Sequence, residues 1–127
     1  MNNKEKINIG SSILTVGYLG LSSVFFIIAK DADLDTATGR HLLAGALANI
    51  AFSFAQIMIA NFALRKGERW AWWSNLIPAF GYGATILIID ATHVQPAKLI
   101  ATLAPQAAGI IILSVGLIIT GIGLFKK

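Results

Sequence analysis

The chain contains no cysteine and few charged side chains. Of its 127 residues none is cysteine, and Asp, Glu, Lys and Arg together make up only 13%. The absence of cysteine excludes disulfides, thiolate catalysis, iron–sulfur clusters and cysteine-ligated zinc. Soluble domains carry about 25% charged residues, so the low charged fraction indicates that most of this chain does not face water.

The charges that are present lie almost entirely outside four long apolar stretches. None of the stretches contains Asp, Glu, Lys, Arg or His. Each is long enough to cross a bilayer core of about 30 Å at about 1.5 Å per residue, and backbone groups in hydrocarbon must be satisfied within a helix. The sequence therefore predicts an all-α integral membrane protein, one domain over residues 1–127, with four transmembrane helices in an antiparallel bundle. The predicted spans are Ile7–Ala29, Leu42–Leu64, Trp70–Ile89 and Leu99–Phe125.

Lys and Arg are divided unequally between the two ends of these spans. Seven belong to the termini and the second connection: Lys4, Lys6, Arg65, Lys66, Arg69, Lys126 and Lys127. The other three, in the first and third connections, are Lys30, Arg40 and Lys98. Positive residues are enriched on the cytoplasmic side, so both termini are predicted to be cytoplasmic. The net charge of +4 reflects this topology and predicts no nucleic-acid partner.

The connection between the second and third spans is very short. Gly67 supplies a turn residue there, so a tight antiparallel helical hairpin is predicted. Three tryptophans follow at once, at Trp70, Trp72 and Trp73. Indole rings favour the headgroup level, so we expect them to anchor the protein at the membrane interface; a ligand or partner surface is the alternative. Further along, Pro78 is predicted to kink or loosen the third span.

The hairpin segment Arg65-Lys-Gly-Glu-Arg-Trp-Ala-Trp-Trp73 resembles the R-x-G-E-R/K-W-A-W-W hairpin of small, uncharacterised bacterial four-span membrane proteins. The resemblance is confined to residues 65–73. It implies a four-span topology and a location in the bacterial inner membrane, and it implies no particular activity.

Polar residues inside the apolar stretches fall on one face of each predicted helix. Counted from the outer ends of the spans, they form two layers. The outer layer is Ser22, Asn49, Tyr82 and Gln106, and the deeper layer is Thr15, Gln56 and Asn75. One interpretation is interhelical hydrogen bonding, which contributes about 0.6 kcal/mol per bond in membranes. The other is a polar cavity for a small substrate.

A second candidate site lies at the outer ends of the spans. His41, Asp90 and His93 form the one set that could support acid–base chemistry or metal binding. Histidines at membrane ends are more often ordinary interfacial residues, so we assign no metal, no cofactor and no catalytic residue. Ion-coupled transport usually requires a titrating group within the membrane, and none lies inside the four stretches.

These patterns favour a non-enzymatic protein that acts by association. The first hypothesis is an accessory or assembly subunit of a membrane complex, or a small homo-oligomer, with the lipid bilayer and another membrane protein or itself as partners. A carrier or channel for a small solute or lipid, using the polar layers, is the alternative. A membrane enzyme acting on a lipid or quinone through the outer His/Asp set is a further alternative.

Overall fold

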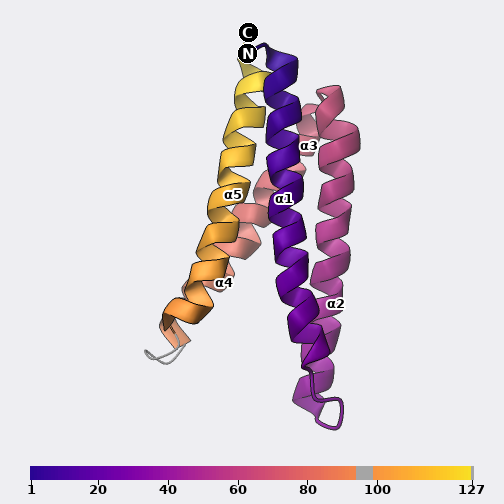
Figure 1. The fold of residues 1–127 in the computed structure, drawn as a ribbon, viewed down its shortest axis with the longest axis vertical. Helices are drawn as coiled ribbons and strands as arrows, with labels where there is room; N and C mark the ends of the chain where they lie inside the picture. The colour runs from indigo at the N-terminus through magenta and orange to yellow at the C-terminus, as the bar shows by residue number, and fades with distance from the viewer. Residues whose placement is uncertain (94–98, 127) are drawn as a thin grey trace.

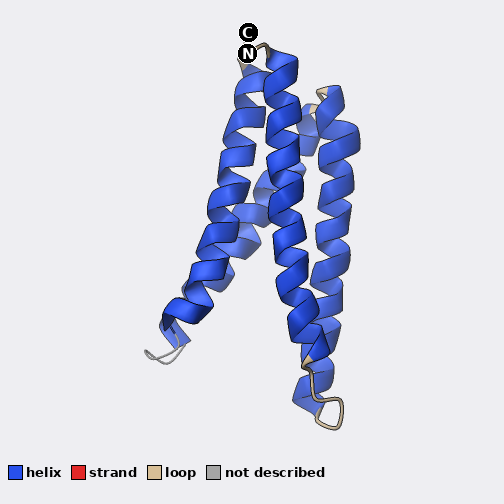
Figure 2. Ribbon diagram, in the orientation of Figure 1, coloured by secondary structure: helices blue, strands red, loops and turns tan. Residues whose placement is uncertain are grey.

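The protein is all-helical, as predicted. A computed structural model describes residues 1–93 and 99–126, and no strand occurs in those two ranges. Figure 2 shows helices joined by short loops. The elements are α1 (Asn3–Lys30), α2 (Ala37–Met58), η1 (Ile59–Ala63), η2 (Leu64–Lys66), α3 (Arg69–Ile77), η3 (Pro78–Gly83), α4 (Ala84–His93) and α5 (Leu99–Phe125).

Within residues 1–93 and 99–126, three helices are long and apolar enough to cross a membrane. They are Asn3–Lys30, Ala37–Lys66, in which η1 and η2 continue α2, and Leu103–Phe125. The third predicted span, Trp70–Ile89, is divided among α3, η3 and α4, and none of these pieces would cross a bilayer alone. Length and composition therefore support membrane-spanning helices at three of the four predicted positions.

The division of the third span follows from its sequence. Proline has no backbone N–H to donate to the preceding turn, and its ring crowds the carbonyl four residues earlier. The backbone responds by widening into a π-helical segment over Pro78–Gly83 before α-helical bonding resumes at Ala84. This is the region in which the sequence predicts a kinked or loosened helix.

The helices form two arms that meet at one end of the molecule. Helix α1 lies between α5 and α2 and contacts both, running antiparallel to each (Figure 1). The chain ends lie together at the closed end, where Asn3 Nδ2 donates to the Lys126 carbonyl oxygen at 3.1 Å. Towards the other end, the α1–α2 arm and the α4–α5 arm diverge (Figure 1).

Helices α1 and α5 approach closely because glycines face one another across their contact. A Cβ atom on Gly10 would lie 2.7 Å from the Gly116 carbonyl oxygen, and one on Gly116 would lie 2.9 Å from Leu14 Cγ. Real side chains do not tolerate such contacts without moving the helices apart. The small-residue faces predicted from the sequence thus meet at this contact.

The turn between α2 and α3 is tight, but the predicted hairpin opens beyond it. Gly67 has a φ of 84°, its N–H donates to the Leu64 carbonyl at 2.9 Å, and the Glu68 N–H donates to the Ala63 carbonyl at 3.2 Å. Helix α3 contacts η1 and η2 near the turn and then α5. The hairpin prediction therefore holds at the turn only, because α3 crosses behind α1 to reach α5 (Figure 1).

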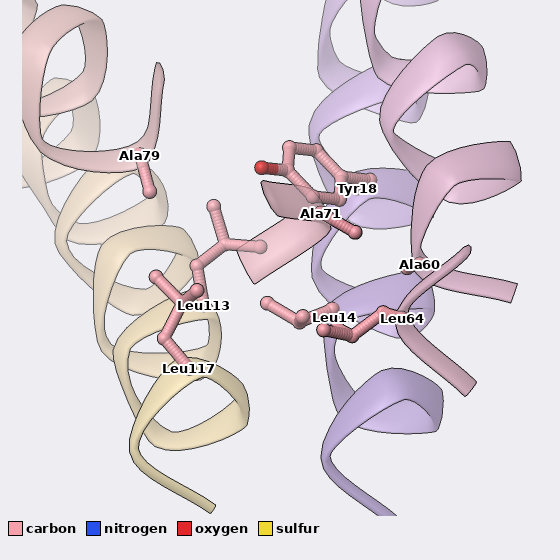
Figure 3. Packing of buried hydrophobic residues seen from close by; sticks show 8 residues of the cluster. All are labelled: Leu14, Tyr18, Ala60, Leu64, Ala71, Ala79, Leu113 and Leu117. Atoms are coloured by element: carbon pink, nitrogen blue, oxygen red, sulfur yellow. The ribbon is translucent and has the colours of Figure 1, made fainter. Parts of the chain in front are cut away.

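A small core joins the arms in the closed half of the molecule. Side chains from α1, η1, η2, α3 and α5 meet there, and η3 adds Ala79 (Figure 3). Its buried members are Leu14, Tyr18, Ala60, Leu64, Ala71, Ala79, Leu113 and Leu117. This core fixes the closed end and leaves the space between the diverging arms less filled.

Candidate binding cavity

A partly enclosed cavity of about 230 Å³ lies where the two arms diverge. Its walls come from the second half of α1, the middle of α2, the π-helical segment η3 and the first half of α5. The lining residues are Tyr18, Leu21, Val24, Phe25, Ile28, Asn49, Phe52, Ser53, Pro78, Ala79, Gly83, Pro105, Gln106, Ile110 and Leu113. All four walls therefore belong to segments that the sequence predicts to be transmembrane.

Four of the lining residues carry polar side chains, and none carries a charge. They are Tyr18, Asn49, Ser53 and Gln106. Their amide and hydroxyl groups can donate and accept hydrogen bonds, but the amides and the serine cannot act as acids or bases. The remaining lining is apolar apart from backbone. The cavity therefore suits an uncharged, mainly apolar molecule with one or two hydrogen-bonding atoms.

The polar groups on α2 retain hydrogen-bonding capacity towards the cavity. Asn49 Nδ2 donates to the Gly45 carbonyl at 2.8 Å, and its Oδ1 accepts no hydrogen bond from any described residue. Ser53, one turn further, is only 3% exposed, and its hydroxyl has no hydrogen-bond partner within residues 1–93 and 99–126. Both side chains can therefore bond to a molecule in the cavity without breaking an interhelical contact.

Tyr18 closes the cavity on the side of the core. Its ring is 2% exposed, and its hydroxyl donates to the backbone carbonyl oxygen of Asn75 at 3.4 Å. This distance is beyond the usual range for a hydroxyl donor, so the bond is weak. The hydroxyl is held near α3 but remains available to a better acceptor.

The predicted outer polar layer is brought together in part. Asn49 and Gln106 line the same cavity from opposite arms. Ser22 is buried at 8% exposure but is not part of the lining, and its hydroxyl is unpartnered among the described residues. The side chain of Tyr82 lies outside the described residues.

The deeper layer is divided. Gln56 and Asn75 are both buried, and Asn75 Nδ2 donates to the Ala71 carbonyl of its own helix at 2.8 Å. Thr15 instead accepts a hydrogen bond at 2.9 Å from Asn61 Nδ2, which links α1 to η1. Asn61 was not predicted as a site residue. The available signal was its amide inside an apolar stretch, but it lies off the helix face that carries Asn49.

Of the outer His/Asp set, only the side chain of His41 is described. His41 is exposed near the start of α2, whereas residues 90 and 93 end α4 on the other arm (Figure 1). The side chains of Asp90 and His93 lie outside the described residues, as do Lys98 and Lys127. Within the described residues, no group of three or more His, Asp or Glu side chains could hold a metal ion.

The three tryptophans have two different environments. Trp70 and Trp73 are 53% and 52% exposed, so both rings are available to lipid or interface. Trp72 turns inward, where its Nε1 donates to the Leu117 carbonyl at 2.8 Å and its ring packs edge-on against Phe125. Trp72 thus ties α3 to α5, and interface anchoring stays a prediction for Trp70 and Trp73.

Comparison of the chain with family models, with curated proteins and with solved structures gives no significant match. The resemblance of the Arg65–Trp73 segment to bacterial four-span proteins therefore stays a prediction.

Proposed function

We propose that this chain is a non-enzymatic, four-span protein of the bacterial inner membrane that binds or carries an uncharged amphiphile within its helix bundle. The observation that supports this role is the cavity between the arms, with Asn49 and Gln106 on opposite walls. In this proposal α3, η3 and α4 together form the fourth span, and both termini are cytoplasmic.

The size and lining of the cavity favour this ligand class. Its volume of about 230 Å³ exceeds the ~150 Å³ of an engineered apolar cavity that takes up benzene. Apolar side chains such as Val24, Phe52 and Leu113 would contact a hydrocarbon segment. The amides of Asn49 and Gln106 would bond a hydroxyl or carbonyl group. A charged ligand is disfavoured, because no lining side chain would compensate an ion removed from water.

Retention of a defined probe tests the proposal. The purified full chain in mild detergent is incubated with 1-dodecanol or with dodecane, and the bound molecules are counted by native mass spectrometry. We expect dodecanol to be retained and dodecane to be retained less, because only the alcohol can use the polar wall.

A matched pair of variants locates the binding. Val24→Trp introduces a large ring into the lining, whereas Ile27→Trp changes a side chain of α1 that is 62% exposed and outside the lining. Dodecanol retention should fall with Val24→Trp and persist with Ile27→Trp. Equal retention by both variants would place the alcohol elsewhere and contradict the proposal.

A second candidate function is association with another membrane helix, as in an accessory subunit or homo-oligomer. A small-residue face on α2, made of Ala44, Ala48, Ala51 and Ala55, is exposed along its whole length. Small residues at such spacings allow helix backbones to approach closely in lipid. This face supports the association hypothesis independently of the cavity.

Cross-linking in native membranes distinguishes the two functions. Because the natural chain lacks cysteine, Ala48→Cys and Ile27→Cys provide single reactive sites on two exposed helix faces. Association through the small-residue face predicts a discrete cross-linked product from Ala48→Cys and not from Ile27→Cys. Random or absent products from both variants would remove the support for a subunit role.

A further inference from the structure

A second hollow lies on the outside of the closed end and shares no residue with the cavity. Its lining comes mainly from one exposed face of α1, together with Arg65 at the end of η2 and Ile112 of α5. The lining residues are Asn8, Ile9, Ser12, Ile13, Val16, Arg65 and Ile112. We refer to it as the Arg65 groove.

Arg65 is the cation in this groove, and it is held in place by α1. Its Nη2 donates to Ser12 Oγ at 3.1 Å, and Ser12 Oγ in turn donates to the Asn8 carbonyl at 3.0 Å. The guanidinium group has five N–H donors. Within the described residues it makes no other hydrogen bond and no ion pair, so most of its donors face the groove or the surroundings.

The neighbouring arginine is engaged differently. Arg69, in the same short connection, lies over the ring of Phe125, with Cζ 5.4 Å from the ring centroid. It is not part of the Arg65 groove. Among the three cations of this connection, Arg65, Lys66 and Arg69, only Arg65 lines this hollow.

The polarity of the groove changes along α1. Asn8, Ser12 and Arg65 provide polar groups beside the apolar Ile9 at the end that holds both termini. The same end carries Lys4 and Lys6 at the start of α1 and Lys66 at the end of η2. Val16 follows Ser12 by one helical turn, about 6 Å further towards the middle of the molecule, and is 61% exposed. Ile13 and Ile112 extend this apolar part.

We propose that the Arg65 groove binds an anionic phospholipid of the cytoplasmic leaflet. The phosphate would accept hydrogen bonds from the free edge of the Arg65 guanidinium, which matches phosphate oxygens in a bidentate arrangement. The acyl chain would lie against Ile13 and Val16, because the lining beyond Ser12 carries no polar side chain. The surrounding lysines favour a lipid with net negative charge, because juxtamembrane cations attract anionic lipids.

Native mass spectrometry of the full chain with two lipids of identical acyl chains tests this proposal. We expect phosphatidylglycerol to be retained more strongly than phosphatidylcholine. Arg65→Gln should weaken phosphatidylglycerol retention about tenfold, the size expected for losing a hydrogen bond to a charged group. Arg69→Gln removes the same charge from the same connection and should leave retention within about twofold of the natural chain, since its partner is Phe125.

A second variant keeps the test decisive if Arg65→Gln does not fold, as judged by circular dichroism. Val16→Trp fills the apolar part of the groove without changing charge, and it should also reduce phosphatidylglycerol retention. Equal retention of the two lipids by the natural chain would overturn the proposal. So would an equal loss in Arg65→Gln and Arg69→Gln, because the attraction would then be general rather than local.

Discussion

At the residue scale, the polar side chains that line the cavity make few hydrogen bonds to the rest of the protein. Ser53 is nearly fully buried, yet its hydroxyl has no partner among the described residues. A hydroxyl that lines a cavity without a partner can donate a hydrogen bond to a bound molecule and accept one from it. Ser53 therefore offers a hydrogen-bonding group to the cavity without giving up an interhelical bond.

Replacing Ser53 should separate binding from stability. Ser53→Ala is expected to leave the unfolding temperature unchanged or slightly higher, because no described hydrogen bond is lost. Dodecanol retention should fall several-fold, since a hydrogen bond contributes about 0.5–1.5 kcal/mol. Thermal unfolding in detergent and native mass spectrometry measure the two effects. A clear loss of stability would show that the hydroxyl has a structural role.

Glycine at position 116 should be required for the contact between α1 and α5. In Gly116→Ala the new Cβ would lie 2.9 Å from Leu14 Cγ and 3.0 Å from the Gly10 carbonyl oxygen. Overpacking of this kind costs typically about 1–3 kcal/mol, so the unfolding temperature should fall. Gly20→Ala is the control, because nothing lies within 4 Å of a Cβ at that position. Equal unfolding temperatures for the two variants would contradict the close contact.

At the element scale, η3 connects the fold to the cavity. Pro78, Ala79 and Gly83 all line the cavity, and all belong to the segment in which the helix widens. A regular α-helix over the same residues would turn their side chains by a different angle. The proline therefore influences which groups face the ligand as well as the shape of the helix.

Restoring the backbone N–H at this position should change binding more than stability. Pro78→Ala permits continuous α-helical bonding through residue 78, which favours a regular helix. We expect the unfolding temperature to be maintained or raised and dodecanol retention to fall. Retention equal to that of the natural chain would show that the π-helical segment does not shape the site.

The elements could be predicted from the sequence to different extents. Uncharged stretches long enough to span a bilayer predicted α1, the helix through Lys66 and α5, because hydrophobic length is a local property. The path of α3 could not be predicted, since it depends on Trp72 reaching the Leu117 carbonyl of α5. Asn49 and Gln106, which counting depth along the spans assigns to one layer, line one cavity. Thr15 instead bonds to Asn61, a partner that lies off the predicted face.

At the scale of the whole molecule, the two ends differ in both charge and packing. The closed end holds the chain termini and the cations of the second connection, whereas Lys30 and Arg40 lie at the end where the arms diverge (Figure 1). Under the positive-inside rule the closed end would face the cytoplasm. The cavity would then lie in the outer half of the membrane.

Accessibility of single cysteines checks this orientation. The natural chain has no cysteine, so Asp33→Cys and Lys126→Cys can be labelled without background. A membrane-impermeant maleimide should label Asp33→Cys in intact cells and Lys126→Cys only after permeabilisation. The reverse pattern would invert the orientation, and labelling of both from outside would place the two ends on one side.

The most direct test of the central claim, that the bundle binds an uncharged amphiphile between its arms, is a photo-cross-linking map. A long-chain alcohol carrying a diazirine near its hydroxyl group is irradiated with the full chain in native membranes, and the adducts are located by mass spectrometry. The account predicts adducts concentrated at Asn49, Ser53, Gln106 and their lining neighbours, reduced by excess dodecanol. Adducts spread evenly over exposed residues outside the lining, such as Phe26 and Ile118, with no competition by dodecanol, would contradict it.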